Sequence, residues 1–325
     1  MYYQIEQVLE KYGLERASTY KGRQVLVCED KRGLWALKEF GGSLEKADFL
    51  YRLGNYLSEE GFLMDGIVKT KEGELYAEGI DGVNYTLHRW YKGRECDVKN
   101  RMDIMMTVSH LAKLHQVSRN FKPKEGEQIY WREEPVKEYE RHNRELCQIR
   151  NFIQKRKQKS DFERLFLNCF SEFYDQCKGA GTALTEQKMK DSGTRGICHG
   201  DFNQHNILFR SGEPAVIHFE KVRYGIQIFD LCNFMRKILE KYNWDEALGM
   251  AMVEEYGRVC PMQREDVIHL YYRLAYPEKF WKLANHYYAS RKVWISRQNL
   301  EKLQKEIRQN PSRCRYLRKL HRLLE

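Results

Sequence analysis

The stretch Ile197-Cys198-His199-Gly200-Asp201-Phe202-Asn203-Gln204-His205-Asn206-Ile207-Leu208-Phe209 decides the fold of this chain. Its apolar end is followed by Ser211-Gly212-Glu213-Pro214 and then by Ala215-Val216-Ile217. Two apolar runs separated by turn residues are typical of a β-hairpin. Asp201 and Asn206 stand just before this hairpin. The stretch therefore predicts a loop that presents a carboxylate and an amide at the base of a hairpin, at about residues 197–220.

The spacing of Asp201 and Asn206 indicates the chemistry of this loop. Kinase catalytic loops follow D-x-x-x-x-N, because the aspartate must meet the acceptor hydroxyl while the asparagine reaches a Mg²⁺ ion on the phosphates. A His-Gly-Asp turn can also arise by chance. The order of elements argues against chance, since a β-rich region with a strand lysine precedes the loop and a hairpin and a helix start follow it. We therefore expect Asp201 to be catalytic and Asn206 to be a metal ligand.

The first ninety residues alternate between strand and helix patterns. Residues 24–28 and 34–40 are β-prone runs around the turn residues 29–33, which predicts a hairpin. Ser43 is expected to cap a helix that ends at Gly61. The apolar face of this helix comprises Ala47, Leu50, Leu53 and Leu57. Further short strands are expected at residues 67–70, 75–78 and 85–91.

From residue 97 onward, helical patterns dominate. A first apolar stripe comprises Ile104, Val108, Leu111 and Leu114. We expect a long polar-rich helical stretch over residues 139–173, a looser segment with Gly179, Gly181 and Gly193, and a helix over residues 229–242 with Asp230 as N-cap. Beyond Val267 the chain is again expected to be helical. The predicted fold class is therefore α+β, with a small lobe of antiparallel sheet and one helix over residues 1–89 and a larger helical lobe over residues 90–325.

Composition indicates a globular chain with reduced cysteines. The nine cysteines are dispersed, odd in number and without a C-x-x-C pair, which favours reduced thiols in the cytoplasm. The chain lacks an N-terminal charged and apolar leader pattern and any run of about 18 apolar residues, which argues against secretion and membrane spanning. We expect no membrane partner.

The net charge of +10 raises the question of an anionic partner. Basic residues are dense at residues 141–159 and 308–322, where they alternate with apolar residues at helical spacing. This pattern favours solvated helix faces over a nucleic-acid surface. A nucleotide or another small anionic ligand is the expected partner, and nucleic acid is not.

The His-Gly dipeptide before Asp201, together with the hairpin that follows, resembles the aminoglycoside phosphotransferase and choline kinase branch of the protein-kinase-like superfamily. The resemblance implies a two-lobed kinase-like fold with ATP as cofactor. It implies that Lys38 pairs with the α- and β-phosphates, with Glu45, or secondly Asp48, as its acidic partner. The segment 18–23 has Gly22 as its one glycine, so its grip on a nucleotide is expected to be weak.

The same resemblance assigns supporting roles. It places the hinge between the lobes at residues 87–91, where the backbone around Arg89 and Tyr91 would meet an adenine, although ordinary strand residues explain these side chains equally well. It gives His115, His199 and Asp230 structural roles. For Asp230, an N-cap is a sufficient explanation by itself.

His218 departs from the pattern of active members. In them this position, twelve residues after Asn206, is an aspartate that binds Mg²⁺ between the β- and γ-phosphates. Mg²⁺ prefers hard oxygen ligands, whereas imidazole suits softer metals, so His218 is a poor Mg²⁺ ligand. Glu220 lies two residues on and could substitute as metal ligand. We therefore expect Mg²⁺ binding to be weakened.

Aromatic-rich segments at residues 234–244, 276–288 and 292–294 resemble the CotS-like spore coat proteins of endospore-forming bacteria. This resemblance covers most of the chain. It implies synthesis in the cytoplasm of the mother cell, deposition in the spore coat and other coat proteins as partners. Two functions follow. The first is a pseudokinase, that is, a degenerate or weak phosphotransferase that acts in coat assembly or ligand binding. The alternative is an active ATP-dependent kinase of a small-molecule hydroxyl.

Overall fold

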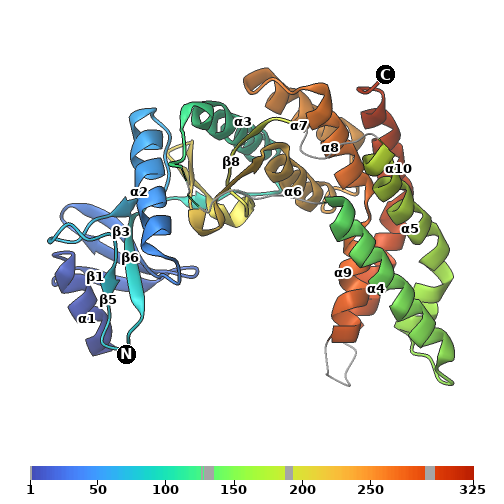
Figure 1. Cartoon of the computed structure of the whole chain (residues 1–325), viewed down its shortest axis with the longest axis horizontal. Helices are drawn as coiled ribbons and strands as arrows, with labels where there is room; N and C mark the ends of the chain where they lie inside the picture. Colours follow the sequence, from blue (N-terminus) through green and yellow to red (C-terminus); the bar gives the residue numbers. More distant parts are fainter. Residues whose placement is uncertain (1, 126, 128–134, 187–192, 290–296) are drawn as a thin grey trace. The chain divides into compact units, whose positions relative to one another are not determined.

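The computed structural model describes residues 2–125, 127, 135–186, 193–289 and 297–325. The chain divides into two compact units, one of residues 1–131 and 196–224 and the other of residues 132–195 and 225–325 (Figure 1). The loop and hairpin around Asp201 therefore belong to the same unit as the N-terminal sheet. The predicted lobe boundary at residue 89 stays a prediction.

A sheet of six antiparallel strands forms the centre of the first unit, within the described residues. The order is β1-β2-β3-β6-β4, and β5 also pairs with β6. The strands are β1 (Ser18–Lys21), β2 (Leu26–Asp30), β3 (Gly33–Glu39), β4 (Ile67–Val68), β5 (Ala77–Glu78) and β6 (Asn84–Arg89). The predicted hairpin is confirmed as β2 and β3, and the predicted short strands are confirmed as β4, β5 and β6.

The two faces of this sheet differ in character. Helix α1 (Tyr2–Lys11) packs beside β5 on one face. The core on that face comprises Val8, Leu9, Tyr12, Leu14, Cys28, Leu37, Ala77 and Leu87. Full burial of such side chains stabilises the fold by about 1.5–3 kcal/mol each. On the other face, Val27 lies opposite Ala36, and the alternation along β3 places Lys38 on the same face as Ala36.

Helix α2 (Leu44–Glu59) is built as the sequence predicts. The side chain of Ser43 accepts a hydrogen bond from the backbone N of Lys46 and caps the helix, and Gly61 follows its end with a positive φ of 69°. The predicted apolar face is buried. This helix packs beside β4.

The rest of the first unit carries the predicted loop. Helix α3 (Arg101–Val117) buries the predicted stripe and is followed by the 3₁₀ turn η1 (Ser118–Asn120). The strands β7 (Arg94–Glu95), β9 (Ile207–Arg210) and β10 (Glu213–Val216) form a second sheet, which confirms the predicted hairpin. Short turns η2 (Gln204–Asn206) and η3 (Phe219–Lys221) flank it. Strands β8 (Arg195–Cys198) and β11 (Arg223–Ile226) pair with each other.

The second unit is mainly helical in its described residues. Its helices are α4 (Pro135–Lys155), α5 (Asp161–Glu186), α6 (Ile228–Leu239), α7 (Glu246–Val259), α8 (Arg264–Ala275), α9 (Glu278–Ala289) and α10 (Arg297–His321). A core rich in aromatic side chains joins α4, α5, α8 and α9, with Phe166, Phe173 and Phe280 fully buried. The helical tail is confirmed, while residues 292–294 lie outside the described residues.

The helical stretch expected over residues 139–173 is present as two helices. Ser160 starts α5 with a capping box, in which its backbone N donates to Glu163 and the backbone N of Glu163 donates to the Ser160 hydroxyl. Two other predictions for this unit are wrong. Gly179 and Gly181 lie inside α5 and not in a looser segment. Asp230 is not an N-cap, because α6 begins at Ile228 and Asp230 lies buried in its first turn.

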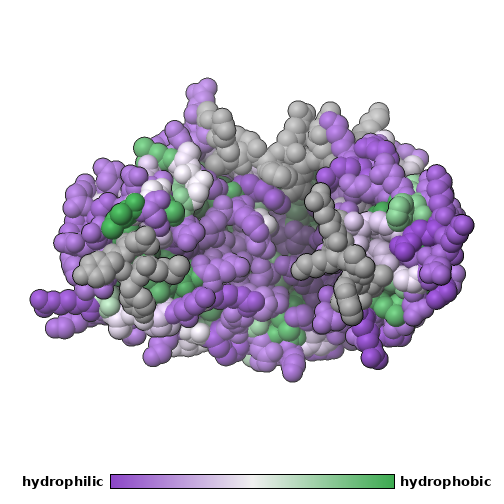
Figure 2. All heavy atoms as spheres, turned by 90° about the horizontal axis from the view of Figure 1, so that it is seen from below, coloured by the Kyte–Doolittle hydropathy of each residue, from purple (hydrophilic) through white to green (hydrophobic). Residues whose placement is uncertain are grey.

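None of the helices in the described part of the chain is both long and apolar enough to cross a lipid bilayer. The face shown in Figure 2 is mainly hydrophilic, with hydrophobic side chains in small separate groups. The order of the elements confirms the predicted β-rich N-terminal region and the larger helical portion that follows it.

Candidate functional site

Five of the predicted site residues line one cleft in the first unit. The cleft has a volume of about 1240 Å³. Its polar lining includes Arg23, Lys38, Asp201, Asn203, His205, Asn206, His218, Glu220 and Lys221. The five are Lys38, Asp201, Asn206, His218 and Glu220. These residues come from β3 and from the segment around the β9–β10 hairpin.

His199 holds the loop before the hairpin in place. Its Nδ1 accepts a hydrogen bond from the backbone N of Asp201 at 3.2 Å, and its Nε2 lies 3.0 Å from the carbonyl oxygen of Ile217. One acceptor and one donor on the same ring describe a neutral imidazole with the proton on Nε2. His199 is fully buried, in agreement with its predicted structural role.

The backbone at residue 200 explains why the middle residue of the His-Gly-Asp motif is glycine. Its φ is +80°, and a Cβ atom there would lie 2.2 Å from the carbonyl oxygen of Lys221. No side chain fits such a distance, and the left-handed backbone favours glycine as well. The loop before Asp201 can therefore pack directly against η3.

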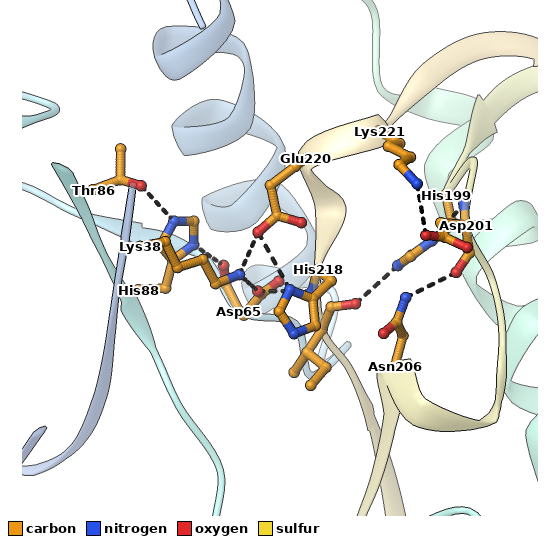
Figure 3. Close-up of polar contacts among 11 residues, drawn as sticks. Lys38, Asp65, Thr86, His88, His199, Asp201, Asn206, His218, Glu220 and Lys221 are labelled. Atoms are coloured by element: carbon orange, nitrogen blue, oxygen red, sulfur yellow. Dashed lines mark hydrogen bonds and ion pairs between the residues drawn. The ribbon is translucent and has the colours of Figure 1, made fainter. Parts of the chain in front are cut away.

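The Asp201 carboxylate is both accessible and held in position (Figure 3). Its Oδ2 lies 2.9 Å from Nζ of Lys221, its Oδ1 accepts from Nδ2 of Asn203 at 3.1 Å, and its side chain is 36% exposed. Asn206 donates through Nδ2 to the backbone oxygen of Asp201 at 2.9 Å. A carboxylate so placed can accept a proton from a hydroxyl, provided that Lys221 moves or shares it.

Lys38 is buried between two carboxylates. Its Nζ lies 2.5 Å from Oδ2 of Asp65 and 2.6 Å from Oε1 of Glu220, and the lysine is 5% exposed. Burial alone would lower the pKa of Lys38, but the charges of Asp65 and Glu220 raise it above its usual value. Lys38 is therefore a fixed cation whose charge is already balanced inside the protein.

The predicted partners of Lys38 in α2 are wrong. Glu45 is exposed and hydrogen bonds with Ser43, while Asp48 pairs with Arg52 at 2.8 Å. The acidic partner of Lys38 is Asp65, because the segment after α2 pairs with β10. There the backbone N of Asp65 donates to Val216 O at 3.3 Å.

Asp65 is a functional residue that the sequence reasoning missed. Besides Lys38, its Oδ2 accepts from the backbone N of His218 at 2.8 Å. Its carbonyl oxygen lies 2.8 Å from Nδ1 of His88, whose Nε2 meets the Thr86 hydroxyl at 2.9 Å. Burial and the nearby Lys38 charge lower the pKa of His88 to about 4, so the ring is neutral and donates through Nδ1. Thr86 and His88, two polar residues at alternate positions of β6 and so on one face of it, were the available sequence signal.

His218 stands where the resemblance places the metal-binding aspartate. Its backbone is left-handed, with φ 69° and ψ 55°, a conformation that few non-glycine residues adopt. Its Nδ1 lies 3.5 Å from Oε1 of Glu220. Burial alone would raise the pKa of Glu220, but the hydrogen bonds from His218 and Lys38 hold it well below its usual range. Glu220 is therefore an anion that is already engaged by protein cations and donors.

These donors do not fit a Mg²⁺ ion. Mg²⁺ requires several hard oxygen ligands in near-octahedral geometry. At this position the chain offers an imidazole, and the neighbouring carboxylate of Glu220 is bound by Lys38. The described residues contain no group of three or more His, Cys, Asp or Glu side chains arranged to hold a metal. The ligand roles predicted for Asn206, His218 and Glu220 stay predictions.

The remaining predicted residues lie away from the cleft lining. Tyr91 donates its hydroxyl to Met64 O at 2.7 Å, and Arg89 reaches Ser58 at 3.4 Å, so their predicted cofactor role stays a prediction. His115 is fully buried in α3, in agreement with a structural role.

Further charged side chains near the cleft were not predicted. Arg23 lies 3.2 Å from Glu95 and 2.5 Å from Nδ1 of His205, and so joins the turn after β1 to the loop of Asp201. Lys46 donates to Val222 O at 2.8 Å, and burial lowers its pKa to about 8 against the opposing charge of Glu220. Arg23 and Lys46 thus add two basic side chains near the site.

The chain is similar in sequence to known proteins. Residues 5–320 match the family described as "Spore coat putative kinase YutH". Spore coat protein S of Bacillus subtilis (strain 168) is 24% identical over 316 residues, which cover 94% of this chain and 89% of that protein.

Solved structures share the fold. An aminoglycoside phosphotransferase from Alicyclobacillus acidocaldarius has a TM-score of 0.86 at 21% identity, over 98% of this chain and 96% of that one. The amicoumacin kinase hAmiN, solved with AMP-PNP and Ca²⁺, has a TM-score of 0.64 at 14% identity, over 98% and 96% of the two chains. Choline kinase LicA from Streptococcus pneumoniae has a TM-score of 0.51 at 13% identity, over 95% and 98%. The predicted kinase-like fold class is confirmed.

Proposed function

Because the chain belongs to the spore coat YutH family, we propose that it is a kinase-fold coat protein that binds phosphate-bearing small anions without Mg²⁺ and transfers phosphoryl groups weakly or not at all. It would be made in the cytoplasm of the mother cell and act in the assembled coat with other coat proteins. The name of the Bacillus subtilis relative supports the coat role.

One observation carries the proposal. At the place where an active kinase would hold its metal, His218 and Lys38 share the single carboxylate of Glu220. Phosphoryl transfer depends on positioning and on cations that neutralise charge developing on the phosphate oxygens. A site whose anions are already balanced internally lacks a ligand set for that cation.

Two exposed basic side chains support the binding of an anion without a metal. Lys221 is 69% exposed on the cleft and Arg23 is 55% exposed, so both could turn toward a phosphate. Charge-assisted hydrogen bonds of this type are among the stronger ones in proteins. Binding through these side chains needs no divalent ion. The ligand is therefore expected to bind equally well in a chelator.

The alternative function is an active ATP-dependent kinase of a small-molecule hydroxyl. The observation that favours it is Asp201, whose carboxylate is accessible and oriented by Asn203. In such a reaction Asp201 would accept the hydroxyl proton while the acceptor oxygen bonds to the γ-phosphorus and ADP leaves. This alternative needs a cation at the phosphates, which Lys221 would have to supply.

Calorimetry and measurements of turnover distinguish the proposed function from the alternative. The wild-type chain should bind ATP or tripolyphosphate with the same affinity in EDTA and in Mg²⁺, and its phosphoryl transfer should be slower than ordinary kinases by about 10²–10³, the usual cost of losing one strong electrostatic contact. His218→Asp should make ATP binding stronger in Mg²⁺ than in EDTA. Turnover at about 1–100 s⁻¹ that Asp201→Asn abolishes would establish the alternative. Should His218→Asp leave Mg²⁺ dependence unchanged, Glu220→Gln tests whether Glu220 is the ligand.

A further inference from the structure

The apolar part of the Lys38 face of the sheet is covered by the side chain of Trp90. Val27 pairs with Ala36, and the period of two along β3 places Lys38 on the same face as Ala36. Val25, Val27 and Ala36 form a small buried apolar cluster, and Trp90 and Leu34 pack against it. The indole thus lies on the same face as the cleft lysine.

Trp90 also reaches the charged end of this face. Lys38 Nζ lies 5.7 Å from the centre of the indole, within the range of a cation–π interaction. The ring of His218 lies 5.8 Å away at an interplanar angle of 79°, an edge-to-face arrangement. The backbone N of Trp90 donates to Leu34 O at 3.0 Å, and this hydrogen bond fixes the position of the Trp90 backbone. The indole is therefore held between the apolar cluster and two residues that line the cleft, Lys38 and His218.

A nucleotide would need the surface that Trp90 covers. When the phosphates of a nucleotide lie in the cleft that Lys38 lines, its aromatic base needs a flat apolar surface within reach on the same face. Val25, Val27 and Ala36 provide that surface, and Val25 also lines the cleft. Indole is a fused bicyclic ring, as is a purine, so the two compete for one place.

We propose that Trp90 occupies the base position and makes the cleft selective for phosphate groups that carry no base, such as pyrophosphate or tripolyphosphate. This inference rests on the proposed function, in which the cleft binds phosphate-bearing anions. A nucleotide must displace the indole and its contacts with Lys38 and His218, whereas a base-free polyphosphate leaves them in place. Trp90 is thus a specificity-determining residue.

Titration calorimetry of the full chain tests this with tripolyphosphate, ATP and adenosine. In the wild type, tripolyphosphate should bind at least as tightly as ATP, and adenosine should not bind. Trp90→Ala should gain about tenfold or more in ATP affinity, which corresponds to about 1.4 kcal/mol, and should bind adenosine. Its affinity for tripolyphosphate should change by less than about threefold, or 0.7 kcal/mol. Trp90→Leu, which keeps an apolar cover and protects folding, should show a smaller gain of the same sign.

Trp35→Ala is the matched control, because Trp35 is adjacent to Ala36 and so points to the opposite face of β3, where it packs with the α1 core. It should leave the ratio of ATP to tripolyphosphate affinity unchanged. An unchanged ratio in both Trp90 variants, with tripolyphosphate still bound, would overturn the inference and leave the proposed function standing. Failure of the wild type to bind tripolyphosphate at all would overturn the proposed function and the inference with it.

Discussion

Replacing Asp65, the buried partner of Lys38, by alanine is expected to destabilise the first unit strongly. Asp65 is 2% exposed and its Oδ2 accepts hydrogen bonds from Lys38 at 2.5 Å and from the backbone N of His218 at 2.8 Å. Without it, Lys38 keeps only Glu220, whose side chain is 41% exposed. The buried ammonium then lacks its better-shielded partner.

The magnitude follows from the burial of the pair. Removing one partner of a buried ion pair typically costs about 3–5 kcal/mol, because the other charge is left uncompensated. Glu220 retains part of the compensation, so the lower end, about 3 kcal/mol, is expected for Asp65→Ala. For a unit of this size each kcal/mol corresponds to about 2–4 °C, which predicts a fall in Tm of about 6–12 °C.

Differential scanning calorimetry of the full chain measures this shift. Asp48→Ala is the matched control, because that carboxylate pairs with Arg52 and Lys124 at the surface and its loss should cost at most about 1 kcal/mol. Lys38→Met should also destabilise, while the double variant should be more stable than the sum of the two changes by at least about 1 kcal/mol. An Asp65→Ala variant no less stable than Asp48→Ala, or strict additivity in the double variant, would refute the buried pair.

Three further predictions concern the loop, the cation and pH. Gly200→Ala should lower Tm much more than Gly212→Ala, although both glycines have a positive φ. A Cβ atom at residue 200 would lie 2.2 Å from Lys221 O, whereas one at residue 212 would meet nothing within 4 Å. Equal shifts in Tm would contradict the close packing at Gly200. Lys221→Met should weaken tripolyphosphate binding about 3–10-fold in calorimetry with little change in Tm, whereas Lys99→Met, an exposed lysine elsewhere, should have no effect. Stability should fall as pH drops from 6.5 toward 4, because the pKa of buried His88 is lowered to about 4 and the unfolded chain takes up the proton first. This effect is worth up to about 3 kcal/mol, and His88→Gln should remove it from the pH dependence of urea unfolding while His286→Gln should not.

Where the relevant signal is local, the sequence alone determined the structure. The β2–β3 hairpin and the β9–β10 hairpin follow from apolar runs separated by turn residues. Helix α2 follows from its apolar period and the cap at Ser43. The spacing of Asp201 and Asn206 was enough to indicate a kinase-like loop, because that geometry is set within six consecutive residues.

Local signals were also overlooked. Ser160 and Glu163 form a capping box that separates α4 from α5, and this S-x-x-E pattern is readable in the sequence. The start of α6 at Ile228 is different, because Ile228 and Phe229 are fully buried and tertiary packing extends the helix ahead of Asp230. Propensity at a helix end is weak enough for such packing to override it.

Only the tertiary structure decided which groups surround Lys38. Its partners are Asp65, 27 residues away, and Glu220, 182 residues away, and no periodic pattern links them. They meet because Val216 of β10 pairs with residues 63–65, which brings the segment after α2 beside His218. The sequence identifies His218 as an unusual residue at a metal position. That its neighbouring carboxylate is already bound by a buried lysine depends on contacts between distant segments, and their pairing is selected by the packing of the whole unit.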